Sequence, residues 1–319
     1  MRALYLIVIL SILVATGCKK EEDCPQQKNS SEEQLTLTSI DTLVTLSYFF
    51  PAISCNGHPE LCGKRFDEVV FALTHNSQAS NDEFSFFAAN QDGNVSQQLA
   101  AGIRGLGIKA YWEANASCGD GSQGMYMYHG DPIFGCIKME DYLSDVKSFL
   151  VSNPTEIILM TIEGGASTER LDSMYSYAGL GDFQYDHTWG ENWPTMIEMI
   201  ESNKRLVVLS DNGDAEDFEG FHGLWNYTVD VNYDIQDPAN FDCDYARGNP
   251  DGYFYQMNHF VTIITPQQNS AQTINQYEYL YNRAVDCMTQ NSRKPNFIML
   301  DFYATGDVVQ VVDSLNLNF

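Results

Sequence analysis

The sequence predicts an α/β fold with a single domain, a (β/α)8 TIM barrel. Short apolar runs alternate with stretches of helical periodicity, which favours a parallel sheet covered by helices. About eight such units follow one another over roughly 250 residues, which is the usual size of this barrel. Almost every apolar run also ends in an ionisable or hydrogen-bonding residue. In such a barrel the carboxyl ends of the strands converge on one face, where the active site lies.

Eight apolar runs are expected to form the strands. Each is a short run that needs burial, and most are bounded by polar or turn-forming residues. The run 69–74 stands out, because it is followed directly by a histidine, His75. The eight runs are 69–74, 103–109, 125–128, 156–162, 205–210, 224–231, 253–264 and 296–300.

Helices are expected between these runs. In 139–152, apolar residues recur at helical spacing, and Asn153-Pro154 ends the helix. Pro194 is placed in the first turn of another helix, where a missing backbone N–H is tolerated. The expected helices are 90–102, 139–152, 194–202, 272–291 and 306–315.

Residues 1–17 have the features of a lipoprotein signal peptide. Arg2 precedes an apolar stretch that is too short to span a bilayer comfortably. The stretch ends in Ala15-Thr16-Gly17-Cys18, which resembles a bacterial lipobox, so we expect cleavage before Cys18 and lipidation of its thiol. The alternative is an ordinary secretory signal.

Residues 18–50 are rich in polar side chains and are interpreted as a lipid-anchored tether, so residues 51–319 form the predicted barrel domain. The charged segment 19–23 resembles the export tags of surface lipoproteins. The expected location is therefore the bacterial outer membrane, with the protein anchored by lipid and facing the periplasm or the cell surface.

Eight cysteines are present, and disulfides are allowed outside the cytoplasm. With Cys18 lipidated, proximity along the chain suggests three pairs and leaves Cys24 in the tether. Zinc binding is the alternative, although no CxxC or HxxxH spacing supports it. The suggested pairs are Cys55–Cys62, Cys118–Cys136 and Cys243–Cys287.

The formal net charge of −26 at pH 7 argues against nucleic-acid binding, because such a surface repels polyanions at long range. A local pocket must therefore recognise any anionic substrate. We expect a monomer without a cofactor or a resident metal ion.

Polar residues at the predicted strand ends indicate a polar pocket at the barrel mouth. Two of them, His75 and His129, suit general acid–base catalysis, since the pKa of histidine lies near neutral pH. Asp301 would neighbour the first strand and could orient His75. Lys109 could stabilise charge on a phosphoryl group, unless it is a solvated surface lysine. The full set is His75, Lys109, His129, Glu163, Asp211, Asn258 and Asp301. The histidines expected to be structural or at the surface are His58, His187 and His222.

Several segments together resemble the phosphatidylinositol-specific phospholipase C X-domain family, over about residues 53–316. The loop Cys55-Asn56-Gly57 to Leu61-Cys62 resembles an extracellular, disulfide-bearing branch. The other segments are Thr74-His75-Asn76-Ser77, Gly102-Ile103-Arg104, His129-Gly130, 157–163, Trp193-Pro194-Thr195, 204–208, Asn258-His259-Phe260 and 296–303.

This resemblance implies a distorted barrel and cleavage of an inositol phospholipid or glycosyl-inositol phospholipid. The inositol 2-hydroxyl would attack phosphorus, releasing diacylglycerol and a cyclic inositol phosphate. It also implies that His75 is the general base, His129 the general acid and Asp301 the partner of the base. We expect Lys109 to act on the phosphoryl group. The residues expected to bind substrate are Asn76, Glu163, Asp211 and Asn258.

The sequence departs from the family pattern at three positions. Bacterial members of the family carry Asp where Asn76 stands, and Asp and Arg where Gly107 and Lys109 stand. Calcium-dependent members carry acidic metal ligands at the latter two places. Asn76 and Glu163 alone are too few ligands for a strong calcium site, so a metal-independent enzyme is predicted.

A catalytically weak or inactive barrel that binds a polar headgroup or a glycan is the alternative function. A glycerophosphodiester phosphodiesterase is disfavoured, because its His-Arg-Gly start and its paired acidic metal ligands do not occur in the sequence.

Overall fold

The computed structural model of the chain describes residues 53–85, 87–113, 121–263 and 265–319. The predicted signal peptide and tether, with Cys18 and Cys24, and also Cys118, lie outside the described residues. Residues 52–319 form one compact unit.

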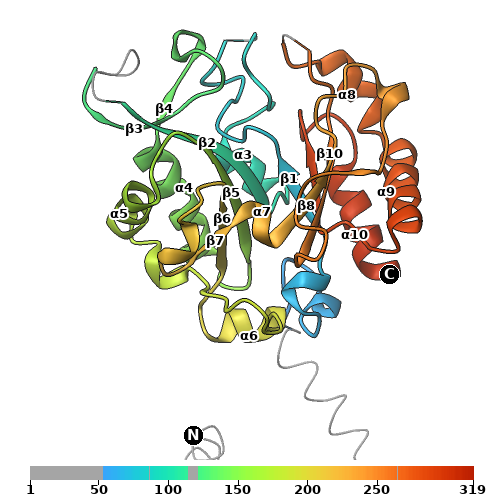
Figure 1. Cartoon of the computed structure of the whole chain (residues 1–319), viewed down its shortest axis with the longest axis horizontal. Coiled ribbons are helices and arrows are strands. Elements are labelled where there is room, and N and C mark those ends of the chain that lie inside the picture. The colour runs from blue at the N-terminus through green and yellow to red at the C-terminus, as the bar shows by residue number, and fades with distance from the viewer. Residues whose placement is uncertain (1–52, 86, 114–120, 264) are drawn as a thin grey trace, which may run out of the picture. The chain divides into compact units, whose positions relative to one another are not determined.

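The strands and helices of this unit are drawn in Figure 1. The strands are β1 (Phe71–Thr74), β2 (Gly105–Glu113), β3 (Gly124–Met127), β4 (Ile137–Lys138), β5 (Ile158–Gly164), β6 (Leu206–Ser210), β7 (Phe221–Gly223), β8 (Thr228–Val231), β9 (Tyr245–Gly248), β10 (Phe254–His259) and β11 (Phe297–Leu300). The α-helices are α3 (Val95–Ala100), α4 (Met139–Ser152), α5 (Thr168–Ala178), α6 (Met196–Glu201), α7 (Leu224–Tyr227), α8 (Gln268–Ile274), α9 (Tyr277–Asn291) and α10 (Val308–Asn318). Six 3-10 turns join them: η1 (Pro59–Leu61), η2 (Phe66–Glu68), η3 (Pro132–Phe134), η4 (Gly181–Phe183), η5 (Ala215–Asp217) and η6 (Pro238–Asn240).

A curled, mostly parallel sheet forms the centre of the fold, in the order β7-β6-β5-β2-β1-β11-β10-β8. All the pairings along this path are parallel. All four helices α4, α5, α9 and α10 cover the outer face of this curled sheet, with α4 and α5 at the left and α9 and α10 at the right in Figure 1. The predicted fold class, a mixed α/β fold of the TIM-barrel type, is confirmed.

The barrel is distorted because its ring of hydrogen bonds is open. Among the described strands, no pairing joins β7 to β8. The short helix α7 lies between these strands in the chain, at the start of the run 224–231 that was predicted to be wholly strand. A short apolar run does not by itself distinguish a strand from a buried helical turn.

The run 125–128 also differs from the prediction, because β3 pairs antiparallel with β2 and does not take a place in the parallel ring. With β4 it extends β2 into an antiparallel flap beyond the barrel. Strand β9 is a second antiparallel addition and pairs with β8.

Alternate residues of the central strands face two different hydrophobic clusters. Ala72 of β1 and Met160 of β5 pack in the cluster that includes residues of the outer helices. Phe71, Leu73 and Leu159 lie in the cluster that fills the inside of the barrel. Because side chains of a strand alternate between its faces, residues two and four positions beyond these inner ones also face the inside.

The helices follow the predicted pattern with some changes. Helix α4 has the predicted bounds, while the predicted helix 272–291 divides into α8 and α9. Thr195 caps α6 in a capping box with Glu198, so this helix begins after Thr195 and not at Pro194. Helix α5 was not predicted. None of the helices that the structure describes is long and apolar enough to cross a membrane.

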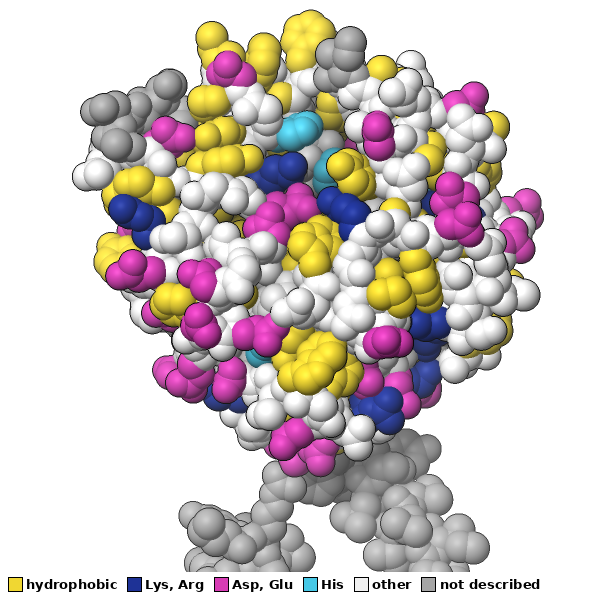
Figure 2. Space-filling model, in the orientation of Figure 1, with side chains coloured by type: hydrophobic (Ala, Val, Ile, Leu, Met, Phe, Trp, Pro, Cys, Tyr) yellow, Lys and Arg dark blue, Asp and Glu magenta, His cyan; other side chains and the backbone are white. Residues whose placement is uncertain are grey.

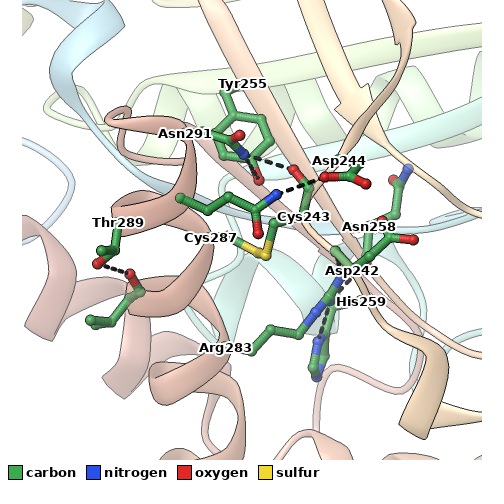
Figure 3. Close-up of a disulfide and its surroundings, with 12 residues drawn as sticks. Asp242, Cys243, Asp244, Tyr255, Asn258, His259, Arg283, Cys287, Thr289 and Asn291 are labelled. Carbon is green, nitrogen blue, oxygen red and sulfur yellow. Dashed lines mark hydrogen bonds between the residues drawn. A yellow bond between two sulfur atoms is a disulfide. The ribbon is translucent and has the colours of Figure 1, made fainter.

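Two predicted disulfides, Cys55–Cys62 and Cys243–Cys287, are present, so zinc binding is wrong for these four cysteines. Cys136 is also disulfide-bonded, whereas Cys118 lies outside the described residues. Figure 3 shows how Cys243–Cys287 joins the segment before β9 to α9, where the Asn291 amide donates a hydrogen bond to the Cys243 carbonyl. This end of β9 is thereby held against the helix.

Candidate active site

A cavity of about 250 Å³ opens where the parallel strands end. Figure 2 shows histidine, basic and acidic side chains gathered around this hollow, with hydrophobic side chains along its upper rim. Its walls include six of the residues that the sequence predicts for the site. They are His75, Asn76, Lys109, His129, Glu163 and Asn258.

His75 follows directly after β1 and is held at one face and at both ring nitrogens. Its Nδ1 lies 2.9 Å from Oδ1 of Asp301, which follows β11 in the same way. Phe260 stacks on the imidazole with a centroid separation of 4.0 Å. Asp301 is only 6% exposed, so its carboxylate acts on His75 in a site with little screening by water.

His129 lies two residues beyond the end of β3, and its ring centroid is 6.3 Å from that of His75. The backbone carbonyl of Ala88 lies 3.3 Å from His129 Nδ1 and accepts its proton, which leaves Nε2 for a ligand. Burial lowers the pKa of His129, and the charges of His75 and Lys109 lower it further. His129 is therefore a stronger acid than an exposed histidine.

Lys109 and Glu163 face each other across the β2–β5 pairing, in which their Cα atoms are register partners. Strand alternation points both side chains into the cavity. Gly107 and Thr161, two residues earlier on the same two strands, line the cavity as well. Lys109 Nζ lies 3.7 Å from Glu163 Oε2. At this distance the two charges pair loosely, and the ammonium can also reach an anion in the cavity.

The residues present do not fit a calcium ion. Gly107 stands where an acidic ligand would be required, and a Cβ at this position would lie 3.0 Å from Thr74 O and 3.3 Å from Thr161 Oγ1. The Lys109 ammonium faces the Glu163 carboxylate, so a positive charge already stands beside the one acidic ligand. Among the residues that the structure describes, no group of three His, Cys, Asp or Glu side chains could hold a metal ion.

The other predicted residues are placed as follows. Asn76 is buried with a left-handed backbone (φ 46°), and its Nδ2 lies 3.0 Å from His75 Nε2. Asn258 donates hydrogen bonds to Asp230 and to the Val231 carbonyl, so it fastens β10 to β8.

Asp211 follows β6 but does not belong to the described residues that line the cavity. Burial of its carboxyl group and the negative charge of Glu163 raise the pKa of Asp211 to about 6, although the residue as a whole is exposed.

Arg247 is a cavity residue that the sequence analysis missed. It comes from β9 and reaches the cavity beside Glu163, with an Nη1–Oε1 distance of 3.9 Å. Buried Asp230 accepts hydrogen bonds from its Nε and Nη2 at 3.0 and 2.6 Å. The guanidinium also lies over the rings of Trp225 and Tyr233, so it is held firmly while Nη1 points toward Glu163.

Asn90 and Phe260 were also missed, for different reasons. Phe260 lies two residues after Asn258, so alternation along the predicted strand could have placed it on the same face. Asn90 begins the predicted helix 90–102, but the structure places it in the connection between β1 and α3, because the helix begins only at Val95. It donates a 2.9 Å hydrogen bond from Nδ2 to Asp301 Oδ1.

The histidines that were expected to be structural have structural contacts. His58 pairs with Asp313 at 3.0 Å, His187 stacks on Trp193, and His222 lies 3.0 Å from the Tyr185 carbonyl oxygen. The sixth histidine, His259, is buried against Arg283 (Figure 3), and burial lowers its pKa to about 3.

The cavity therefore combines two titratable histidines with two cations and one accessible carboxylate. Such a set can take a proton from one atom, give a proton to another and stabilise negative charge between them.

Comparison with family models and known sequences shows that the chain matches one family. The family model described as PI-PLC X matches residues 61–316. The chain is 29% identical to PI-PLC X domain-containing protein 1 of Arthroderma benhamiae over 290 residues, which cover 82% of this chain and 89% of that protein. An uncharacterized secreted protein of the same fungus is 27% identical over 82% of this chain, but the match spans only 64% of that protein.

Comparison with solved structures shows the same fold. Phosphatidylinositol-specific phospholipase C from Staphylococcus aureus superposes with a TM-score of 0.53 at 16% sequence identity. The match covers 79% of this chain and 94% of that enzyme.

The electrostatic coupling between the cavity residues can be tested on His129. We expect Lys109→Met to raise the pKa of His129, because the variant removes a nearby positive charge that disfavours the imidazolium. Lys204→Met is the control, since Lys204 precedes β6 and lies at the opposite end of the strands. NMR titration of the ring resonances measures both variants. A pKa of His129 that does not respond to Lys109→Met contradicts this geometry.

Proposed function

Because the chain belongs to the PI-PLC X domain family, we propose that it is a phospholipase C-like phosphodiesterase that cleaves an inositol phospholipid or a glycosyl-inositol phospholipid. The products would be diacylglycerol and a cyclic inositol phosphate. The observation that carries this proposal is the pair of histidines on one cavity, of which one is bonded to a buried carboxylate and the other to a backbone carbonyl.

In the proposed reaction His75 is the general base. With its Nδ1–H donated to Asp301, its Nε2 carries the lone pair and takes the proton of the inositol 2-hydroxyl, whose oxygen attacks phosphorus. Asp301 stabilises the imidazolium that forms. The two rings, whose centroids lie 6.3 Å apart, are close enough for both to reach one phosphoryl group bound in the cavity.

His129 is the general acid in this proposal. It gives a proton from Nε2 to the glycerol oxygen as the bond from that oxygen to phosphorus breaks. Because the pKa of His129 is lowered from its ordinary value of 6.5, its acidic form is lost as the pH rises through the mildly acidic range and is already scarce at neutral pH. The reaction should therefore be slower at alkaline pH than at mildly acidic pH.

The charged groups have separate tasks. Lys109 would stabilise the negative charge on the phosphoryl oxygens. Glu163 and Arg247 lie further along the cavity wall and offer an acceptor and a donor to ring hydroxyl groups. Asp230 already neutralises Arg247, so this part of the cavity suits an uncharged polyol better than a second phosphate.

A lipid substrate is supported by the rim of the cavity. Ile133 and Phe134, four and five residues after His129, are 78% and 45% exposed. Ile263, directly after Thr262 of the cavity wall, is 48% exposed. Large apolar side chains at the mouth of a site are typical of contact with a membrane or an apolar ligand.

We propose a location outside the cytoplasm, without assigning a particular membrane. The description of one relative as a secreted protein agrees with an extracytoplasmic location, whereas the outer-membrane lipoprotein interpretation has no support from these fungal relatives. Lipidation of Cys18, membrane anchoring and the monomeric state stay predictions from the sequence.

The second candidate function is headgroup or glycan binding without turnover. One observation favours it: Lys109 stands where the resemblance leads us to expect an arginine, and an ammonium is a poorer bidentate phosphate ligand than a guanidinium.

Product analysis distinguishes the two functions. Incubated with phosphatidylinositol vesicles, the protein should release diacylglycerol and a cyclic phosphodiester, detected by ³¹P NMR, and a chelator should leave the rate largely unchanged. Binding of the vesicles without any product would support the second function. Loss of turnover in chelator, restored by calcium, would contradict the metal-free mechanism.

Substitution of the rim tests the lipid substrate. We expect Ile133→Ser combined with Phe134→Ser to lower activity on vesicles about tenfold, because less apolar surface is buried in the membrane. Activity on a short-chain, soluble inositol phospholipid should change little. The matched control is Ile53→Ser with Leu317→Ser, which changes two exposed apolar residues at the other end of the barrel. Equal losses on both substrates would show that the rim does not act through the lipid surface.

A further inference from the structure

A closed ring of hydrogen bonds surrounds His75. Asp301 Oδ1 lies 2.9 Å from His75 Nδ1 and accepts a 2.9 Å hydrogen bond from Asn90 Nδ2. Asn90 Oδ1 accepts one from Asn76 Nδ2 at 3.3 Å, and the same Asn76 nitrogen lies 3.0 Å from His75 Nε2. Each of the two imidazole nitrogens thus has a near partner in the ring, and Asn90 Nδ2 also lies 3.5 Å from His75 Nδ1.

The carboxylate determines the direction of every bond in this ring. An ionised carboxylate only accepts, so the Asn90 amide must turn its nitrogen toward Asp301. Its oxygen then faces Asn76, which must also present its nitrogen. The remaining hydrogen of Asn76 Nδ2 can only meet a lone pair on His75 Nε2, so the proton of neutral His75 is on Nδ1 and points to Asp301.

We propose that Asn90 is a positioning residue that keeps His75 in this neutral, Nδ1-protonated form, in which Nε2 is available to take a proton from the substrate. The inference rests on the proposed function only in naming His75 as the base. The protonation state itself can be observed without any turnover.

A second proton on His75 would create a conflict in the empty site. An Nε2–H would face the Asn76 N–H, so the Asn76 amide would have to turn its oxygen toward His75. Asn76 Nδ2 would then no longer donate to Asn90 Oδ1, and the two amide oxygens would face each other. Turning Asn90 as well would bring its oxygen against Asp301. One unfavourable contact remains in every arrangement, which disfavours the imidazolium.

Substrate binding removes this conflict. The nucleophilic hydroxyl would enter at Nε2, and the Asn76 N–H would be released to an oxygen of the substrate. The ring of hydrogen bonds therefore opposes protonation of His75 when the site is empty but not when the substrate is bound.

The position of Asn90 is fixed by its surroundings. Its side chain is buried, and its backbone N–H donates to the Ala79 carbonyl while its backbone carbonyl accepts from Phe302 N–H. Two residues earlier, Ala88 holds His129 through its carbonyl. One short segment, 88–90, thus positions both histidines.

The charged and titratable neighbours of His75 are few among the described residues. Asp301 is bonded to it and His129 lies beside it, while Lys109, Glu163 and Arg247 line the same cavity. His129 needs mildly acidic conditions to carry its proton, because burial lowers its pKa. A hydrogen-bond ring that keeps His75 neutral at the same pH would let His75 be the neutral base while His129 is the protonated acid, as the proposed reaction requires.

The test is a pH titration of the full chain labelled with ¹⁵N in its six histidines, with the His75 signals identified through His75→Ala. At a fixed, mildly acidic pH, we expect Asn90→Leu to raise the ratio of charged to neutral His75 on the order of fivefold, which corresponds to one hydrogen bond of ordinary net strength. Asn76→Gly should act in the same direction. Glycine keeps the left-handed backbone at this position and removes the donor opposite Nε2.

Asn275→Leu is the matched control. Asn275 is equally buried and donates to Asp301, but to its backbone carbonyl and not to its carboxylate. This variant should leave the His75 ratio unchanged. Unchanged ratios in both Asn90→Leu and Asn76→Gly would overturn the proposal, as would an equal rise in Asn275→Leu. If the wild type turned over no inositol lipid, the proposed function would fail while this titration would still decide the role of Asn90.

Discussion

The parallel pairing of β1 with β11 is the interaction on which the candidate site depends. Its register sets Thr74 beside Leu300, so the next residues, His75 and Asp301, emerge side by side. The backbone N–H of His75 continues the ladder by donating to Leu300 O. Because the two strands are buried in the sheet, the distance between imidazole and carboxylate is set by the backbone and not by flexible side chains. A shift of one residue would turn both groups away from the cavity.

Much of the site could be predicted from the sequence, since alternation and strand ends are visible in it. The runs before His75, Glu163 and Asp301 are apolar on both faces, as expected of strands between two hydrophobic clusters. Any polar residue that follows such a run has to lie at its exposed end. This reasoning placed five residues on one cavity, namely His75, Lys109, His129, Glu163 and Asn258, although Asp211, predicted by the same reasoning, is outside it.

The remaining features depend on contacts between distant segments. Arg247 reaches the cavity because β9 pairs antiparallel with β8, and this pairing has no local signature. The disulfide Cys243–Cys287, which holds the preceding segment, was predicted, but it does not by itself place Arg247. Asn90 was expected to begin the helix 90–102, but it lies in the connection before α3 and acts through contacts with Asp301 and Asn76. The direction of β3 was missed for a similar reason, because hydrophobic periodicity identifies a strand but not its orientation. The signal peptide, the tether and Cys118 lie outside the described residues and are untested.

The strongly acidic chain brings two cations together at its proposed site. A net charge of −26 repels anionic substrates at a distance, so Lys109 and Arg247 must act over short range, inside a cavity where screening is weak. Their shared partner Glu163 moderates both charges without forming a tight pair with either.

The division of labour between the two histidines is the central claim of this account, and a comparison of leaving groups tests it most directly. On phosphatidylinositol, His75→Ala and His129→Ala should each lose activity by about 10²–10⁴-fold, the usual range for acid–base catalysis. On a nitrophenyl ester of inositol phosphate, whose leaving group needs no proton, His129→Ala should recover most of its activity and His75→Ala should not. Equal losses of both variants on both substrates would contradict the assignment.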